Sequence, residues 1–189
     1  MEELKLYEGR PADCTGRLEK EIRTYDLLDK LGIQFWRTDH GWMKADTMED
    51  CHVIDACLNA TVCKNLFLCN RQQTQFYLLM MHGDKPFKTK YLSAQLGCAR
   101  LSFADEGHMA EYLHTIPGSV SALELMFDAG GTVQLVIDKA LLADEYISAH
   151  PGLSGSTLRL TREDLLRFVR SVGHEPVIVD LPVEDGAPS

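Results

Sequence analysis

The chain has 189 residues, of which 45% are hydrophobic and 25% are charged, as in an ordinary globular protein. This length predicts one domain that buries roughly 70% of the surface of its unfolded chain. The net charge of −9 argues against a protein that coats DNA or RNA, because extended phosphate binding requires a broad basic surface.

The sequence contains no segment that is typical of secretion or membrane insertion. Residues 1–5 carry acidic and basic side chains instead of an apolar signal-peptide core. The longest apolar run, Phe76–Met81, is far shorter than a membrane span. We therefore expect a cytoplasmic protein with no membrane partner.

The cysteines do not form a metal-binding pattern. Cys51, Cys57, Cys63 and Cys69 recur every six residues, but the C-x2-4-C pairs that are typical of zinc sites do not occur. Reduced thiols are the usual state in a chain without secretion signals. We expect neither a metal nor another cofactor.

Hydrophobic periodicity and turn residues predict alternating helices and strands. After a lead-in over residues 1–17, apolar residues at helical spacing predict a helix from Leu18 to Leu31 that ends at Gly32. Further helices are expected over residues 48–58, 88–96, 105–113, 139–143 and 162–172. Strands are expected over residues 33–37, 61–69, 76–81, 100–103, 133–137, 145–150, 156–160 and 176–181, before a flexible tail over 182–189. A single mixed β-sheet domain of the α/β (α+β) class over residues 18–181 is the simplest arrangement.

The strand expected over Thr61–Cys69 is the central element. Its side chains alternate, so Lys64 shares a face with Leu66 and Leu68, while Asn65 shares the other with Phe67. Both faces are largely apolar, which predicts a strand that is covered on both sides. A lysine in such a strand must reach water, a partner or a ligand, because an isolated buried charge is very costly.

A small basic cluster interrupts the acidic composition. Lys85, Lys88 and Lys90 lie close together in the sequence, and Arg71 precedes them. The cluster can be a solvated loop and helix start. It is also large enough for a protein that touches only the end of an RNA.

The usual catalytic strings of hydrolases, kinases and dehydrogenases are absent from the sequence. Several other strings are informative in their order and spacing. They are Lys64–Leu68, Arg100–Ala104, Pro117–Ser121, Val136–Asp138 and His150–Pro151. Together they resemble the YbaK/prolyl-tRNA editing-domain family, over about residues 18–181.

The resemblance implies an aminoacyl-tRNA deacylase of the editing-domain fold. The order of the strings is similar to the free-standing subgroup that hydrolyses mischarged Ala-tRNA(Pro) in trans and so preserves translation fidelity. The implied partners are the acceptor end of tRNA(Pro) and prolyl-tRNA synthetase, without DNA. The implied catalytic residues are Lys64 and His150, and the implied substrate-binding residues are Thr38, His40, Asn65, Gly118, Ser119, Val120 and Asp138.

This reaction suits such residues. An aminoacyl ester is already activated, so its hydrolysis requires a positioned water and stabilisation of the developing oxyanion. A glycine at position 118 permits close approach of the backbone to a ligand. A pocket that admits alanine and excludes proline would act as a second sieve.

Each residue also has an ordinary structural interpretation. Lys64 can extend to solvent at a strand end, and His150 can simply end a strand. Pro117-Gly118 is typical of a type II turn, and Asp138 can be the N-cap of the following helix. The alternative functions are deacylation of another small aminoacyl group, such as cysteine or serine, and a weakly catalytic module that binds tRNA or a synthetase.

Overall fold

The computed structural model describes residues 4–41 and 48–183. The predicted tail beyond Val183 and the first three residues of the lead-in therefore lie outside the described residues. The helices are α1 (Glu19–Lys30), α2 (Met48–Leu58), α3 (Thr89–Leu96), α4 (Glu106–Leu113) and α5 (Arg162–Ser171), with short 3-10 helices η1 (Ala122–Phe127) and η2 (Lys139–Ala143). Among the described residues, no helix has the length and apolar character needed to cross a bilayer.

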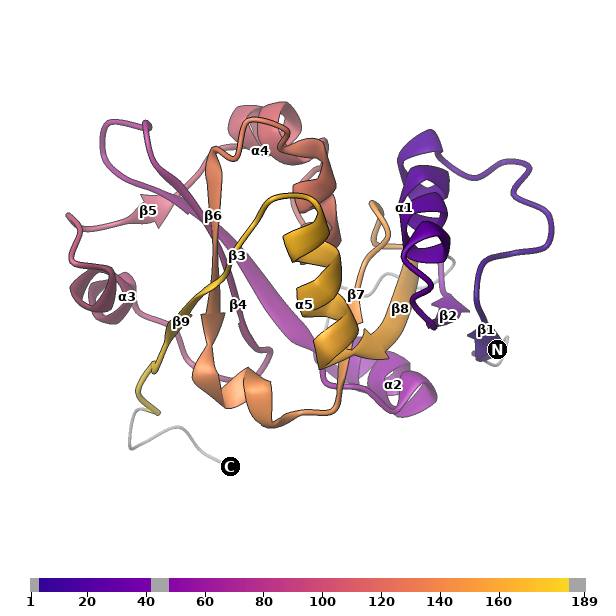
Figure 1. Ribbon diagram of the computed structural model, residues 1–189. Helices are drawn as coiled ribbons and strands as arrows, with labels where there is room; N and C mark the ends of the chain where they lie inside the picture. Colours follow the sequence, from indigo (N-terminus) through magenta and orange to yellow (C-terminus); the bar gives the residue numbers. More distant parts are fainter. Residues whose placement is uncertain (1–3, 42–47, 184–189) are drawn as a thin grey trace.

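The strands form two sheets (Figure 1). The five-stranded sheet has the order β5 (Ser102–Phe103), β3 (Cys63–Cys69), β4 (Phe76–His82), β6 (Val133–Asp138) and β9 (Val177–Val179). The four-stranded sheet has the order β1 (Tyr7–Glu8), β2 (Trp36–Asp39), β8 (Ser156–Thr161) and β7 (Tyr146–Ala149). The mixed α/β class is confirmed, but the strands divide between two sheets instead of joining one.

The two sheets differ in how their strands pair. In the larger sheet β3 and β4 form an antiparallel hairpin, and β6 and β9 continue it in parallel. The smaller sheet is antiparallel throughout and pairs β2, from the N-terminal part, with β8. The two sheets are linked by one isolated β-bridge among the described residues, between Thr61, just before β3, and Ile147 of β7.

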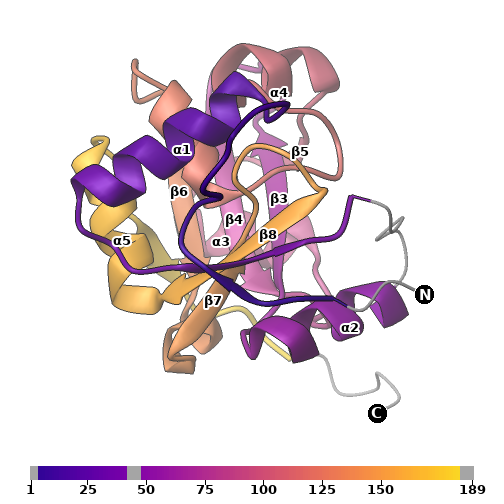
Figure 2. The ribbon, with the colours of Figure 1, turned by 90° about the vertical axis from the view of Figure 1, so that its right-hand side faces the viewer.

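The main hydrophobic core contains side chains from both sheets and from α1, α4 and α5. Figure 2 shows α1 and α5 next to each other on one side of the molecule and α2 below the smaller sheet. A second core lies on the other face of the larger sheet, where Leu92 of α3 and Leu181 pack against it.

The predicted alternation along β3 is confirmed. Phe67 and Cys69 belong to the main core, whereas Leu68 belongs to the second core and Leu66 packs against it. Lys64 and Asn65 therefore face opposite sides of the sheet. This difference decides which of them can line the cavity between the two sheets.

Two of the predicted helix starts are confirmed by their caps. The Asp105 side chain accepts a hydrogen bond from the His108 backbone N–H, and Thr161 accepts one from Asp164. Asp138 precedes η2, but its side chain makes no capping hydrogen bond. The N-cap interpretation of Asp138 is therefore wrong at the level of its side chain.

Candidate active site

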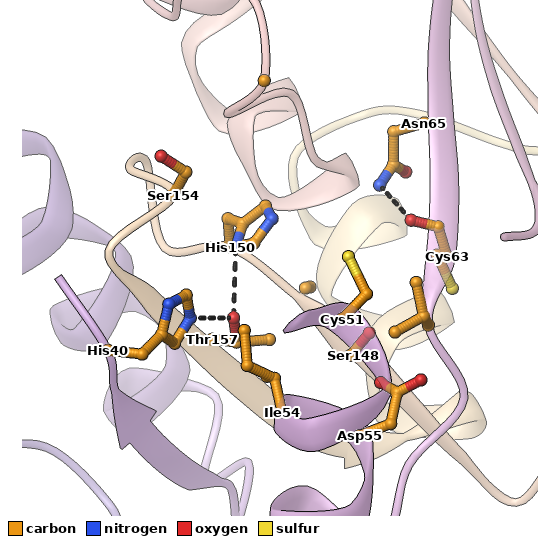
Figure 3. A pocket seen from close by; sticks show the side chains of 13 residues that line it. His40, Cys51, Ile54, Asp55, Cys63, Asn65, Ser148, His150, Ser154 and Thr157 are labelled. Carbon is orange, nitrogen blue, oxygen red and sulfur yellow. Dashed lines mark hydrogen bonds between the residues drawn. The ribbon is translucent and has the colours of Figure 1, made fainter. Parts of the chain in front are cut away.

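A cavity of about 160 Å³ lies where β3 approaches the smaller sheet (Figure 3). Helix α2, strands β7 and β8, and the turns at Gly118 and Ser154 complete its wall. The described residues that line it are His40, Cys51, Ile54, Asp55, Val62, Cys63, Asn65, Gly118, Ser148, Ala149, His150, Ser154 and Thr157.

Two histidines and a threonine form a connected group in this wall. His40 Nε2 lies 2.7 Å from Thr157 Oγ1, which lies 3.4 Å from His150 Nδ1. His150 Nδ1 also lies 3.1 Å from the Ser156 carbonyl oxygen. Because a carbonyl oxygen can only accept, Nδ1 carries the proton and Nε2 of a neutral His150 has a free lone pair.

The surroundings keep both rings neutral. Burial, with a smaller contribution from the neighbouring His150, lowers the pKa of His40 to about 4. Burial also lowers the pKa of His150, and its hydrogen bond to Ser156 only partly opposes this effect. A neutral imidazole with a free Nε2 lone pair can accept a proton from water at neutral pH.

The chain beside His150 is fixed by a turn and a capping box. Ser119 N–H donates to the Ile116 carbonyl across Pro117-Gly118, and Gly118 has φ +83°, so the predicted type II turn is confirmed. Two residues later, the Ser121 hydroxyl donates to the His150 carbonyl over 2.8 Å.

Glu124 completes this support. Its carboxylate accepts the Ser121 backbone N–H over 2.9 Å and closes a capping box at the start of η1. Burial raises the pKa of Glu124 to about 8, with the hydrogen bond from Ser121 acting in the opposite direction. The carboxyl group therefore carries a proton at neutral pH in the folded protein.

Four of the predicted site residues meet at the cavity: His40, Asn65, Gly118 and His150. Asn65 Nδ2 donates weakly to the Cys63 carbonyl, while its buried Oδ1 has no hydrogen-bond partner among residues 4–41 and 48–183. A fifth, Val120, lines an adjoining depression together with Asn65, Gly118 and His150.

The other predicted site residues do not line this cavity. Lys64 Nζ donates to the Lys85 carbonyl over 2.9 Å on the opposite face of the sheet. Lys85 Nζ in turn donates to the buried Asp138 carboxylate over 2.6 Å. Thr38 and Ser119 are buried behind the wall, and Ser119 takes part in the Gly118 turn.

Sequence reasoning missed Thr157, Asp55 and Ser148. Thr157 reaches the site because β8 pairs with β2, in the register that places it opposite Thr38. No local pattern in the sequence carries that long-range register. Asp55 had a weak local signal, since it is an acidic residue within an otherwise apolar stretch of the predicted helix over 48–58.

Within residues 4–41 and 48–183, no three His, Cys, Asp or Glu side chains gather as they would around a metal ion. The cysteines are free thiols, and Cys51 and Cys63 belong to the cavity wall. The groups available for chemistry are therefore the His150 imidazole, the Asn65 amide, the Asp55 carboxylate and the neighbouring hydroxyls.

Comparison with known proteins identifies the family. Residues 43–168 match the family described as the aminoacyl-tRNA editing domain. The prolyl-tRNA editing protein ProX of Acetoanaerobium sticklandii is 30% identical over 154 residues, covering 82% of this chain and 93% of its own length. The prolyl-tRNA synthetase associated domain-containing protein 1 of Danio rerio is 32% identical over 164 residues, covering 86% of each chain.

A solved structure supports the fold. It is described as that of a candidate trans-editing enzyme for prolyl tRNA synthetase, and it superposes with a TM-score of 0.65 at 16% identity, over 86% of this chain and 96% of the other. The sequence resemblance to the editing-domain family is thus confirmed. The chain belongs to the aminoacyl-tRNA editing domain family and is a hydrolase of the deacylase type.

Proposed function

We propose that this protein hydrolyses mischarged Ala-tRNA(Pro) in trans. The observation that carries the proposal is that the neutral His150, whose Nε2 has a free lone pair, lines a cavity of about 160 Å³. A relative whose name describes prolyl-tRNA editing, 30% identical over most of both chains, supports the choice of tRNA. The small cavity supports a small aminoacyl group.

In the proposed reaction His150 acts as a general base. Nε2 accepts a proton from a water molecule as the water oxygen attacks the ester carbonyl carbon. The bond from that carbon to the ribose oxygen then breaks, and the ribose oxygen receives the proton from His150. The products are free alanine and uncharged tRNA, without a metal or another cofactor.

Two neighbours orient this step. Thr157 Oγ1 lies between His40 and His150, and Ser121 binds the His150 carbonyl, so the imidazole has little freedom to turn. The Asn65 amide faces the same cavity with an unpartnered Oδ1. We assign to Asn65 the binding of polar groups on the substrate.

Lys64 is proposed to act at the mouth of the cavity. Strand β3 pairs with β5 only at Leu68 and Cys69, so its outer edge is open beside Lys64 in the part of the chain that the structure describes. The ammonium can reach around this edge after it leaves the Lys85 carbonyl. There it would provide a point charge for a phosphate or for the developing oxyanion.

A basic groove next to the cavity supports an RNA substrate. Arg71, Lys90 and Arg100 line it without any carboxylate among the described lining residues, and Phe103 at its end is 62% exposed. Phe103 also lines the depression that shares Asn65, Gly118 and His150 with the cavity. We place the single-stranded 3′ end of the tRNA along this path, with Phe103 stacking on a base.

The decisive variant is His150→Asn. The Asn amide takes the place of Nδ1 and retains a donor for the Ser156 carbonyl, but it has no group equivalent to Nε2. We expect kcat for Ala-tRNA(Pro) to fall by 10²- to 10⁴-fold, as for loss of a general base. His114→Asn is the matched control, because His114 is exposed, has a left-handed φ of 51° that suits asparagine, and lies outside the cavity.

Near-normal turnover by His150→Asn would overturn the general-base role. Hydrolysis of a serine or cysteine ester in preference to alanine would keep the reaction and change the substrate. A wild-type protein that binds charged tRNA without hydrolysing any ester would be a binding module instead.

A further inference from the structure

One end of the cavity carries a carboxylate that accepts a hydrogen bond from the Val62 backbone N–H but keeps one oxygen without a partner among the described residues. Asp55 projects from α2 into the wall near Ser148, and Figure 3 shows it at the opposite end of the group of labelled residues from Ser154. Its Oδ1 is buried and makes no hydrogen bond within the part of the chain that the structure describes. A buried polar atom without a partner is costly, so its presence in a binding cavity calls for an explanation.

The two thiols beside Asp55 remain uncharged. Burial is the largest cause of the raised pKa of both Cys51 and Cys63, and the Asp55 carboxylate contributes to each shift. Burial also raises the pKa of Asp55 to about 6, with the nearby His52 opposing the shift. The two thiols therefore stay protonated and uncharged at neutral pH, and Asp55 is the one ionised group of the three.

The rest of the cavity is neutral. Among the described residues that line it, Asp55 is the only carboxylate, and none is a lysine or an arginine. The two histidines at the other end have lowered pKa values and are uncharged at neutral pH. The described lining residues thus carry one formal charge at neutral pH, and this charge is negative.

The substrate class of the proposed function supplies the complement. An aminoacyl ester carries a free α-ammonium one carbon away from the ester carbonyl. A ligand with a positive charge at this point would pair with Oδ1 and compensate its desolvation. An ester whose amine is acylated, or is replaced by a hydroxyl, would leave the carboxylate unpaired.

We propose that Asp55 binds the α-ammonium of the aminoacyl group, so that the enzyme selects esters with a free amine over N-acylated esters such as those of peptidyl-tRNA. This inference rests on the proposed deacylase function and adds a subsite to it. Asp55 positions the acyl group, while His150 acts on the water. The selection is by charge and does not depend on the size of the side chain.

The experiment compares two esters of the same tRNA on the full-length protein. One is alanyl-tRNA(Pro), and the other is its lactyl analogue, in which a hydroxyl replaces the ammonium with the same number of heavy atoms. The ratio of their kcat/KM values is measured for the wild type and for Asp55→Asn. The different intrinsic reactivities of the two esters affect both proteins equally and cancel when the two ratios are compared.

We expect the preference for the alanyl ester to be at least tenfold greater in the wild type than in Asp55→Asn. The loss should fall on the alanyl ester, with lactyl hydrolysis changed less than twofold. Asp84→Asn is the control, because the exposed Asp84 lines an outer depression with Asp55 but not the cavity. Thermal unfolding checks that both variants fold.

Equal ratios in the wild type and Asp55→Asn would overturn the ammonium subsite, since the preference would then arise elsewhere. A fall in the hydrolysis of both esters by the same factor would also overturn it, because Asp55 would then serve the structure or the chemistry. Failure of the wild type to hydrolyse either ester would instead refute the proposed function. The two failures are therefore distinguishable.

Discussion

Replacing Gly118 by alanine separates the role of the turn in folding from its role in the site. Gly118 has φ +83°, which side chains rarely adopt, and a Cβ built on it meets no other atom within 4 Å. The residue lines both the cavity and the adjoining depression. The added methyl group therefore strains the backbone and stands in open space beside the substrate without a clash inside the protein.

The cost in stability follows from the backbone alone. A non-glycine residue in the left-handed region costs about 1–2 kcal/mol, and the reduced freedom of the unfolded chain returns roughly 0.4–1 kcal/mol. The net loss is about 1 kcal/mol, which corresponds to a fall in Tm of roughly 2–4 °C for a chain of this size. The loss in activity should be far larger, on the order of a hundredfold in kcat/KM, because displacing a bound substrate by about 1 Å has such an effect.

Gly97→Ala provides the matched control. Gly97 ends α3 with φ +64°, a Cβ there also meets nothing within 4 Å, and it lines neither the cavity nor the depression. Both variants are compared by thermal unfolding and by deacylation of Ala-tRNA(Pro). We expect similar losses in Tm and a loss in kcat/KM for Gly118→Ala alone. Equal activity of the two variants would refute a close approach of the substrate to Gly118.

Three further changes test other parts of the site. The pKa of Glu124 is about 8 in the folded protein and near 4.5 in the unfolded chain, so between these values the unfolded chain releases the proton and the folded protein retains it. Glu124 should therefore lower the free energy of unfolding of the wild type by on the order of 4 kcal/mol from pH 5 to pH 8. In Glu124→Gln, the free energy of unfolding measured with urea should not show this loss. If the stability of the two proteins fell in parallel with pH, the reasoning would be contradicted. Lys64→Ala should lower deacylation at least a hundredfold with a small change in Tm, whereas near-normal turnover would remove Lys64 from the mechanism. Thr157→Val should lower kcat about tenfold at unchanged KM and Thr157→Ser should restore it, since a hydroxyl is what joins His40 to His150; an inactive serine variant would contradict this.

The local elements of the fold could be predicted from the sequence because their signals are local. The helix over Met48–Leu58 and the alternation along β3 follow from periodicity. The separation into two sheets could not be predicted. It depends on β2 pairing with β8, more than a hundred residues later, and no short-range pattern specifies that register.

The candidate site was predictable in part. His150, Gly118, Asn65 and His40 come from the family strings and their surroundings, and they line one cavity. The alternation rule already places Lys64 on the face opposite Asn65, which the resemblance alone does not reveal. Asp55 carries no family signal, and its unpartnered oxygen becomes visible only once α2 is packed beside β3.

The central claim is that a small cavity around the neutral His150 hydrolyses an alanyl ester and excludes a prolyl ester. Its most direct test is the initial rate of hydrolysis of Ala-tRNA(Pro) and Pro-tRNA(Pro) by the wild-type protein, with His150→Asn as the inactive control. We predict rapid hydrolysis of the alanyl ester by the wild type and rates close to the spontaneous one for the prolyl ester, because a packed wall rejects a larger ring. Equal rates for the two esters would contradict the account, since the cavity would then not discriminate by size.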